Sequence, residues 1–201
     1  MFCDIEENIK KENLKIVFIS NYFNHHQKYL CEELNDLTKG NYYFIETEPM
    51  ESERLDRNKY KILLVGTDEN IDKSLPDGII SIHRTQDRNE LAEIYSAADL
   101  FVNSTREENY PTVNMESLAC GTPVLTFNTG GSPEIIDETC GRVVEKDDID
   151  SMYNEIINIC ENNVFSKEDC LSKSKQFDMN ERFKEYLQLY MSLCGEYDEQ
   201  Y

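Results

Sequence analysis

Two glutamates with seven residues between them, Glu108 and Glu116, carry the side chains of this chain best placed for chemistry on a ligand. They flank the start of a short predicted helix, and a glycine pair, Gly130-Gly131, follows the next predicted strand. An ionised carboxylate is a strong hydrogen-bond acceptor, so each glutamate can bind hydroxyl groups. Paired carboxylates beside a glycine turn are typical of a ligand site.

Local patterns indicate the elements that would position these residues. The apolar run 99–104 predicts a strand, and the polar stretch 105–111 predicts the loop after it. Thr112 is expected to cap a helix over 113–120, which Gly121 would end in a left-handed conformation. Pro123 opens the next strand, 124–127. Strand, helix and strand make a parallel crossover, which is right-handed by default.

In parallel sheets, ligands bind outside the carboxyl ends of the strands. The loops 105–111 and 128–134 are expected at that edge, together with the amino end of the predicted helix. Free N–H groups and the helix dipole favour an anion there, usually a phosphate. Carboxylates close to a diphosphate would be repelled unless they met its neutral parts. We therefore assign them to the hydroxyl groups of a sugar and a ribose.

This constellation resembles the Glu-x7-Glu signature of retaining glycosyltransferases with the GT-B fold, which act on nucleotide sugars. The resemblance implies that Glu108 contacts the donor sugar as the catalytic-site residue and that Glu116 contacts the ribose. It also implies close backbone approach at Gly130 and Gly131, and a nucleotide base near the strand end that carries His83 and Arg84, where a purely structural role of His83 is an equal alternative. The donor-binding residues implied in this way are Asn109, Tyr110, Pro111, Thr112, Glu116, Arg84, Gly130 and Gly131.

The resemblance extends in order over residues 60–160, through segments similar to successive elements of that family's carboxyl-terminal domain. These are 61–66, 79–84, 90–99 and 141–145. Two solvated glutamates in an acidic chain would by themselves mean little. The order of the surrounding elements favours the glycosyltransferase interpretation.

The amino-terminal part resembles the first βαβ unit of the same family's acceptor domain, with a strand at 14–20, a helix at 24–38 and a strand at 42–46. A chain of 201 residues is too short for two complete domains of such an enzyme. We therefore expect an internally shortened member with a seam between residues 50 and 60. Its segments would be 14–50, 60–165 and 166–197.

In this hypothesis, the amino-terminal unit replaces the missing first strand and helix of the donor domain. The predicted fold is α/β, with one parallel Rossmann-like sheet flanked by helices. It would contain strands near 15–19, 61–65, 79–83, 100–103 and 124–127.

The segment missing from the family pattern normally ends with an Arg and a Lys that neutralise the leaving diphosphate. Lys61, Arg84 and Arg106 are the nearest candidates by position, and a role as surface charges is the favoured interpretation of each.

Two functions stay open. One is a hexosyltransferase of carbohydrate biosynthesis, moving sugar with retention from a nucleotide sugar to an unknown acceptor, a glycan or lipid-linked sugar. The other is a non-catalytic sugar-nucleotide-binding or interaction module left by an internal deletion.

Composition limits the function classes. A net charge of −20 argues against nucleic-acid partners, and 39% apolar residues suffice for one core. No apolar run reaches the ~18 residues of a membrane span, and the first residues do not form a signal peptide. Seven cysteines without Cys-x-x-Cys spacing suit reduced thiols in the cytoplasm. No cofactor or metal is expected.

Two helices are predicted near the carboxyl end, at 149–162 and 180–194, from the helical spacing of their apolar residues. In the resembled family, the last helix packs on the acceptor domain. Because we expect most of that domain to be missing here, we expect the apolar stripe of 180–194 to use a different surface or a homo-oligomer.

Overall fold

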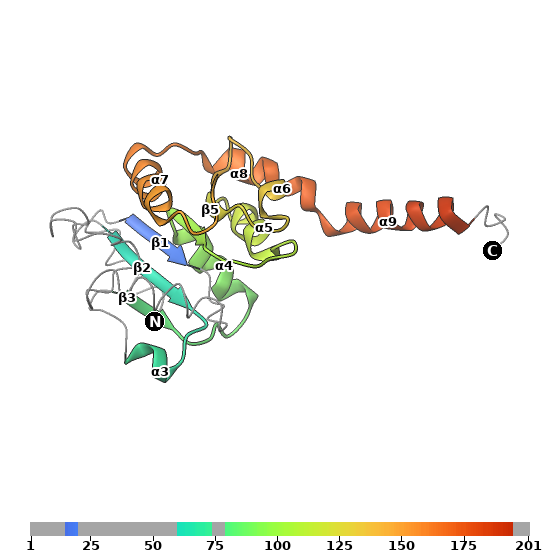
Figure 1. The fold of residues 1–201 in the computed structure, drawn as a ribbon. Coiled ribbons are helices and arrows are strands. Elements are labelled where there is room, and N and C mark those ends of the chain that lie inside the picture. Colours follow the sequence, from blue (N-terminus) through green and yellow to red (C-terminus); the bar gives the residue numbers. More distant parts are fainter. Residues whose placement is uncertain (1–14, 20–59, 74–78, 195–201) are drawn as a thin grey trace.

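A computed structural model of the chain describes residues 15–19, 60–73 and 79–194. These residues form one six-stranded, all-parallel sheet with helices packed on it (Figure 1). The strands are β1 (Lys15–Ile19), β2 (Tyr60–Val65), β3 (Ile79–Ile82), β4 (Leu100–Asn103), β5 (Val124–Phe127) and β6 (Gly141–Val144). The predicted α/β class and all five predicted strands are confirmed.

The strand order is β3-β2-β1-β4-β5-β6, the order of a doubly wound Rossmann sheet. β1 therefore lies in the middle, where Phe18 is aligned with Leu63 of β2 on one side and with Phe101 of β4 on the other. The expected strand near 15–19 is therefore part of the one parallel sheet, and its origin as a replacement from an acceptor domain stays a prediction. The division into segments 14–50, 60–165 and 166–197 stays a prediction, and the predicted helix 24–38 and strand 42–46 lie outside the described residues.

Helices connect the strands and continue beyond the last one. They are α3 (Glu69–Asp72), α4 (Arg88–Ala97), α5 (Thr112–Ala119), α6 (Ser132–Ile135), α7 (Ile149–Asn162), α8 (Lys167–Ser174), the 3-10 turn η1 (Lys175–Phe177) and α9 (Met179–Cys194). The predicted helices 149–162 and 180–194 are confirmed as α7 and α9. α9 projects away from the rest of the molecule (Figure 1).

Alternate side chains of the strands build two apolar layers, because successive residues of a strand point to opposite faces. One layer joins Leu63 and Phe101 to α4, α5 and α8. The other joins Leu100 and Leu125 to α7. Each layer covers one face of the sheet, which explains why β4 and β5 are buried along their whole length.

The start of α5 corrects one sequence prediction. Thr112 was expected to cap the helix, but it is the first helical residue, and Pro111 occupies the cap position. A proline is well tolerated just before a helix, because it has no N–H to leave unpaired and its φ is already fixed near the helical value. The predicted end is right: Gly121 follows the helix with φ of +82°, in the left-handed region.

Candidate functional site

Two loops lie side by side at the carboxyl ends of β4 and β5. Loop 105–111 leads from β4 to α5, and residues 128–131 lead from β5 to α6. The Gly131 N–H donates to the Asn109 carbonyl at 2.6 Å, and the Thr129 hydroxyl donates to the Thr105 carbonyl at 2.9 Å. The structure thus brings together the two predicted site segments, and their backbones hold each other in place.

The glycine pair is required for this contact between loops. Gly130 has φ of +51°, and a Cβ there would lie 1.7 Å from the carbonyl oxygen of Glu108. A Cβ on Gly131 would lie 2.4 Å from the Tyr110 ring. The close approach expected at these glycines is therefore made by loop 105–111. Contact of the same glycines with a ligand stays a prediction.

A buried polar network fixes loop 105–111 to the sheet, and sequence reasoning missed it. Asn103, the last residue of β4, donates from Nδ2 to Oδ1 of Asn114 on α5 at 2.9 Å. Its own Oδ1 accepts the Thr105 hydroxyl at 2.7 Å. Both asparagines are buried. The available signal was an amide residue that ends an otherwise apolar strand, and buried amides need hydrogen-bond partners.

The amino end of α5 has no side-chain cap in the part of the chain that the structure describes. Within the described residues, Pro111 supplies no side-chain cap, and the first turn of α5 contains no acidic residue. Unpaired N–H groups and the positive end of the helix dipole point out of this end of α5. An incoming phosphate would meet these donors, with Thr112 exposed beside them.

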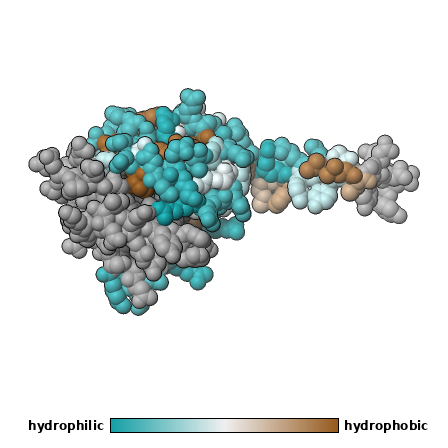
Figure 2. Space-filling model, viewed as in Figure 1, coloured by the Kyte–Doolittle hydropathy of each residue, from teal (hydrophilic) through white to brown (hydrophobic). Residues whose placement is uncertain are grey.

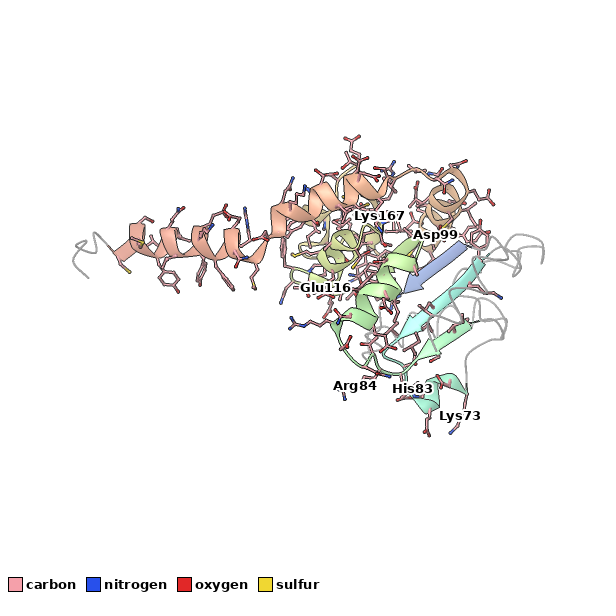
Figure 3. The ribbon with its side chains drawn as sticks, turned by 180° about the vertical axis from the view of Figure 1, so that it is seen from behind. Lys73, His83, Arg84, Asp99, Glu116 and Lys167 are labelled. Atoms are coloured by element: carbon pink, nitrogen blue, oxygen red, sulfur yellow. The ribbon has the colours of Figure 1, made fainter. Side chains whose placement is uncertain are left out.

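The two signature glutamates differ in their surroundings. Glu108 is half-buried in the loop, where one carboxylate oxygen accepts the Asn109 N–H at 3.0 Å. Glu116 is exposed on α5 (Figure 3). Burial raises the pKa of the Tyr95 hydroxyl, and the negative charge of Glu116 raises it further. Glu116 thus lies close to α4, on the side of α5 that faces it.

A second polar group lies at the carboxyl end of β3, where His83 and Arg84 follow the strand (Figure 3). Asp72 joins it from α3: one carboxylate oxygen bonds His83 Nε2 at 2.5 Å, and the other accepts the Ser81 hydroxyl at 2.6 Å. The hydrogen bond to Asp72 raises the pKa of His83 above 6.5. Arg84 is exposed beside this pair. Sequence reasoning had overlooked Asp72, which no local pattern marks.

The basic candidates occupy different places. Lys61 is the second residue of β2, near the amino end of the strand and therefore far from the carboxyl edge. Arg106 lies in loop 105–111, and its Nε donates to Asp147 Oδ1 at 2.6 Å. Asp147 follows β6 and has φ of +67°, a left-handed conformation that few residues other than glycine adopt. Arg106 therefore lies at the carboxyl edge of the sheet, where the site is expected, and it is paired with Asp147.

The comparisons with known proteins identify the family. Residues 13–162 match the family model described as glycosyl transferases group 1. The matched region is more than half of the chain, and it includes β1, both site loops and α7. The chain belongs to the group 1 glycosyl transferases.

Curated relatives match shorter stretches. The chain is 38% identical over 65 residues to D-inositol 3-phosphate glycosyltransferase of Mycolicibacterium smegmatis, a match covering 32% of this chain and 15% of that protein. It is 34% identical over 71 residues to spore coat protein SA of Bacillus subtilis, covering 34% of this chain and 19% of that protein. These matches cover well under a quarter of either relative.

Solved structures share the fold over nearly the whole chain. Sucrose-phosphate synthase from Thermosynechococcus elongatus matches with a TM-score of 0.66 and 20% identity, over 95% of this chain and 48% of that one. Anabaena HepE, in complex with UDP and glucose, matches with a TM-score of 0.63 and 15% identity, over 92% of this chain and 52% of that one. The chain therefore spans about half the length of these structures. No helix among the described residues is long and apolar enough to cross a membrane.

Proposed function

We propose that this chain binds a nucleoside diphosphate sugar at the carboxyl edge of β4 and β5, and that it descends from enzymes that transfer the sugar with retention. The observation that carries the proposal is the uncapped amino end of α5 next to the fixed loop 105–111, in a chain of the group 1 family. A diphosphate suits the α5 end because the end offers donors and a positive dipole, with no acidic residue in the first turn.

In this proposal, the hydroxyl groups of the ligand meet the two glutamates. Glu108 receives the donor sugar, as the catalytic-site residue, and Glu116 receives the ribose. The sugar and the phosphates are faced by the loop residues Asn109, Tyr110, Pro111 and Thr112. The pair Gly130-Gly131 packs against this loop and lies beside the ligand. Arg84, exposed after β3, contacts the base. No metal or cofactor takes part.

The chain is expected to transfer sugar poorly or not at all. A leaving diphosphate needs positive charge in the transition state, and loss of one comparable electrostatic group costs about 10²–10³-fold in rate. Arg106 is the basic residue of loop 105–111, and Asp147 neutralises its charge. A two-domain enzyme also reacts in the cleft between its domains, where closure excludes water. This chain supplies one side of such a cleft.

A calorimetric titration tests the binding site. UDP and UDP-glucose are the first ligands to try, because HepE was solved with UDP-glucose. GDP-mannose is next, since a mannosyltransferase that uses it is among the relatives. We expect Glu116→Gln to weaken nucleotide binding by roughly 1–3 kcal/mol, through lost ribose contacts. Glu168→Gln, on the exposed first turn of α8, is the matched control and should bind as the unaltered chain does. Equal affinity in all three proteins would remove Glu116 from the site.

A turnover assay separates the enzyme from the alternative, a non-catalytic module. Purified chain is incubated with each nucleotide sugar, with and without glycan or lipid-linked acceptors, and release of nucleoside diphosphate is followed. Because Arg106 is already paired with Asp147, we expect it to stabilise a leaving diphosphate poorly. We therefore expect nucleotide binding without sugar transfer. Release at the ~1–10³ per second typical of enzymes would contradict this expectation. The acceptor and a cytoplasmic location stay predictions from the sequence.

A further inference from the structure

α9 is a helix without a packing surface in the described part of the chain. All sixteen of its residues, Met179–Cys194, are exposed. Its large apolar side chains are 50–76% exposed, and they belong to Met179, Phe183, Tyr186, Leu187, Leu189, Tyr190, Met191 and Leu193. Hydrophobic atoms gather along the projecting helix, whereas the visible body is mostly hydrophilic (Figure 2). An isolated helix of this length is marginal in water, so α9 needs a partner.

The spacing of the apolar residues indicates the kind of partner. Five of them repeat at alternating intervals of four and three residues, and we call them the α9 seam: Met179, Phe183, Tyr186, Tyr190 and Leu193. This is the a/d pattern of a two-helix coiled coil. Within the seam, the rings of Tyr186 and Tyr190 already pack edge to face, 4.9 Å apart between centroids. A seam with this period fits another helix with the same period.

Charge favours a second copy of this chain in that role. The chain carries a net charge of −20, so most of its surface repels a copy of itself. On α9 the charges cancel, because Arg182 pairs with Glu185 at 2.8 Å and Lys184 with Glu181 at 2.6 Å. Residues 186–194 carry no charge. α9 is therefore a surface on which two acidic copies can meet without repulsion.

We propose that α9 pairs with α9 of a second copy, with the two helices antiparallel along the seam. The sequence after α9, residues 195–201, carries three acidic residues. The start of α9, residues 179–185, carries two basic and two acidic residues, and its charges cancel. Antiparallel pairing lays each acidic end beside this neutral end of the partner helix. Parallel pairing would bring the two acidic ends together instead.

Light scattering after gel filtration tests the pairing on the full chain, over about a hundredfold range of concentration. The unaltered chain should approach twice its mass of 23.5 kDa at the higher concentrations. The double substitution Phe183→Glu and Tyr190→Glu places charge in the seam, and it should remain at a single chain mass. Gln188→Glu with Ser192→Glu adds the same charge to the same helix outside the seam. This control should still dimerise.

Cross-linking tests the orientation. Cys194 is exposed at the end of α9, and antiparallel pairing places it near position 180 of the partner. After mild oxidation of the Asn180→Cys variant, peptide mass spectrometry should find Cys194 linked to the cysteine introduced at position 180. A link between two Cys194 residues would overturn the antiparallel arrangement.

Three outcomes would overturn the pairing itself. The first is an unaltered chain that stays monomeric at every concentration. If hydrogen exchange then shows α9 protected, its partner is the chain's own residues and the pairing is equally overturned. The second is equal dimerisation of the seam variant and its control. The third is a monomer that instead co-sediments with phosphatidylcholine vesicles through α9.

Discussion

α7 and α9 have similar lengths and similar apolar stripes, but α7 is packed on the sheet and α9 is exposed. α7 buries Met152, Tyr153, Ile156, Ile159 and Cys160 in the apolar layer that contains Leu100 and Leu125. α9 buries none of its residues against the described part of the chain. An apolar stripe thus predicts a helix in need of a packing surface, and the rest of the chain decides whether that surface exists within the same molecule.

The largest expected effect comes from removing equivalent aliphatic side chains from the two helices. Ile156 of α7 is 1% exposed, and Leu187 of α9 is 61% exposed. Ile156→Ala should lower the free energy of unfolding by about 2–5 kcal/mol, because it leaves a cavity in the core. Leu187→Ala should change it by less than about 0.5 kcal/mol in dilute, monomeric protein. Urea unfolding measures both, and similar losses would show that α9 is packed within the chain.

A second pair of substitutions tests whether the tight packing of the α7 region extends to the site loops. Gly130 and Gly121 both have positive φ, but their surroundings differ. A Cβ on Gly130 meets the backbone of Glu108, whereas on Gly121 it meets the flexible side chain of Lys167. Gly130→Ala should cost about 3 kcal/mol and Gly121→Ala about 1 kcal/mol, as judged by thermal unfolding. Equal losses of stability in the two variants would mean that loop 105–111 can move away from the Cβ introduced at position 130.

The asparagine network offers a smaller test of the same packing. Asn103→Ala leaves the amide of buried Asn114 without its partner, which should cost about 1–3 kcal/mol in urea unfolding. Asn128 is the control, since it is exposed and bonded to Glu145 at 3.2 Å. Asn128→Ala should cost less than about 0.5 kcal/mol. If Asn103→Ala also lowers the free energy of unfolding by less than about 0.5 kcal/mol, the asparagine network does not hold loop 105–111 in place.

The smallest effect is expected at the exposed Asp72–His83 pair. Its hydrogen bond raises the folded-state pKa of His83, so the stabilisation is present below about pH 6.5 and is lost as pH rises through the folded-state pKa. An NMR titration should place the pKa of His83 above 6.5, and Asp72→Asn should bring it down. An unchanged titration in that variant would mean that the two side chains do not pair in solution.

Local sequence patterns predicted most of the elements. Val124–Phe127 and Leu100–Asn103 are strands because apolar strand formers follow one another there, and Gly121 ends α5 because a residue with positive φ was needed. The start of α5 was misplaced by one residue, since Thr112 and Pro111 both fit a helix start. These signals act over a few residues, which is why the chain reveals them without its fold.

The candidate site was foreseen only in outline. Glu108 and Glu116 and both loops were predicted from their motif, and the structure brings the loops together. The ligand roles of these residues stay predictions. The partners that hold the loops, Asn103 and Asn114, and the pairing of Arg106 with Asp147 were not predicted. Each of these contacts joins separate elements or loops whose mutual placement the fold decides.

Local patterns in the sequence were enough to predict the strands near 15–19, 61–65, 79–83, 100–103 and 124–127, several of the helices and the glycosyltransferase signature, because periodicity and turn chemistry are local properties. The fold of the whole chain places β1, from near the amino end, in the middle of the sheet between β2 and β4. It also packs Gly130 against loop 105–111 and leaves α9 exposed among the described residues. Burial depends on which distant segments meet, and an apolar residue in the sequence does not specify its neighbour.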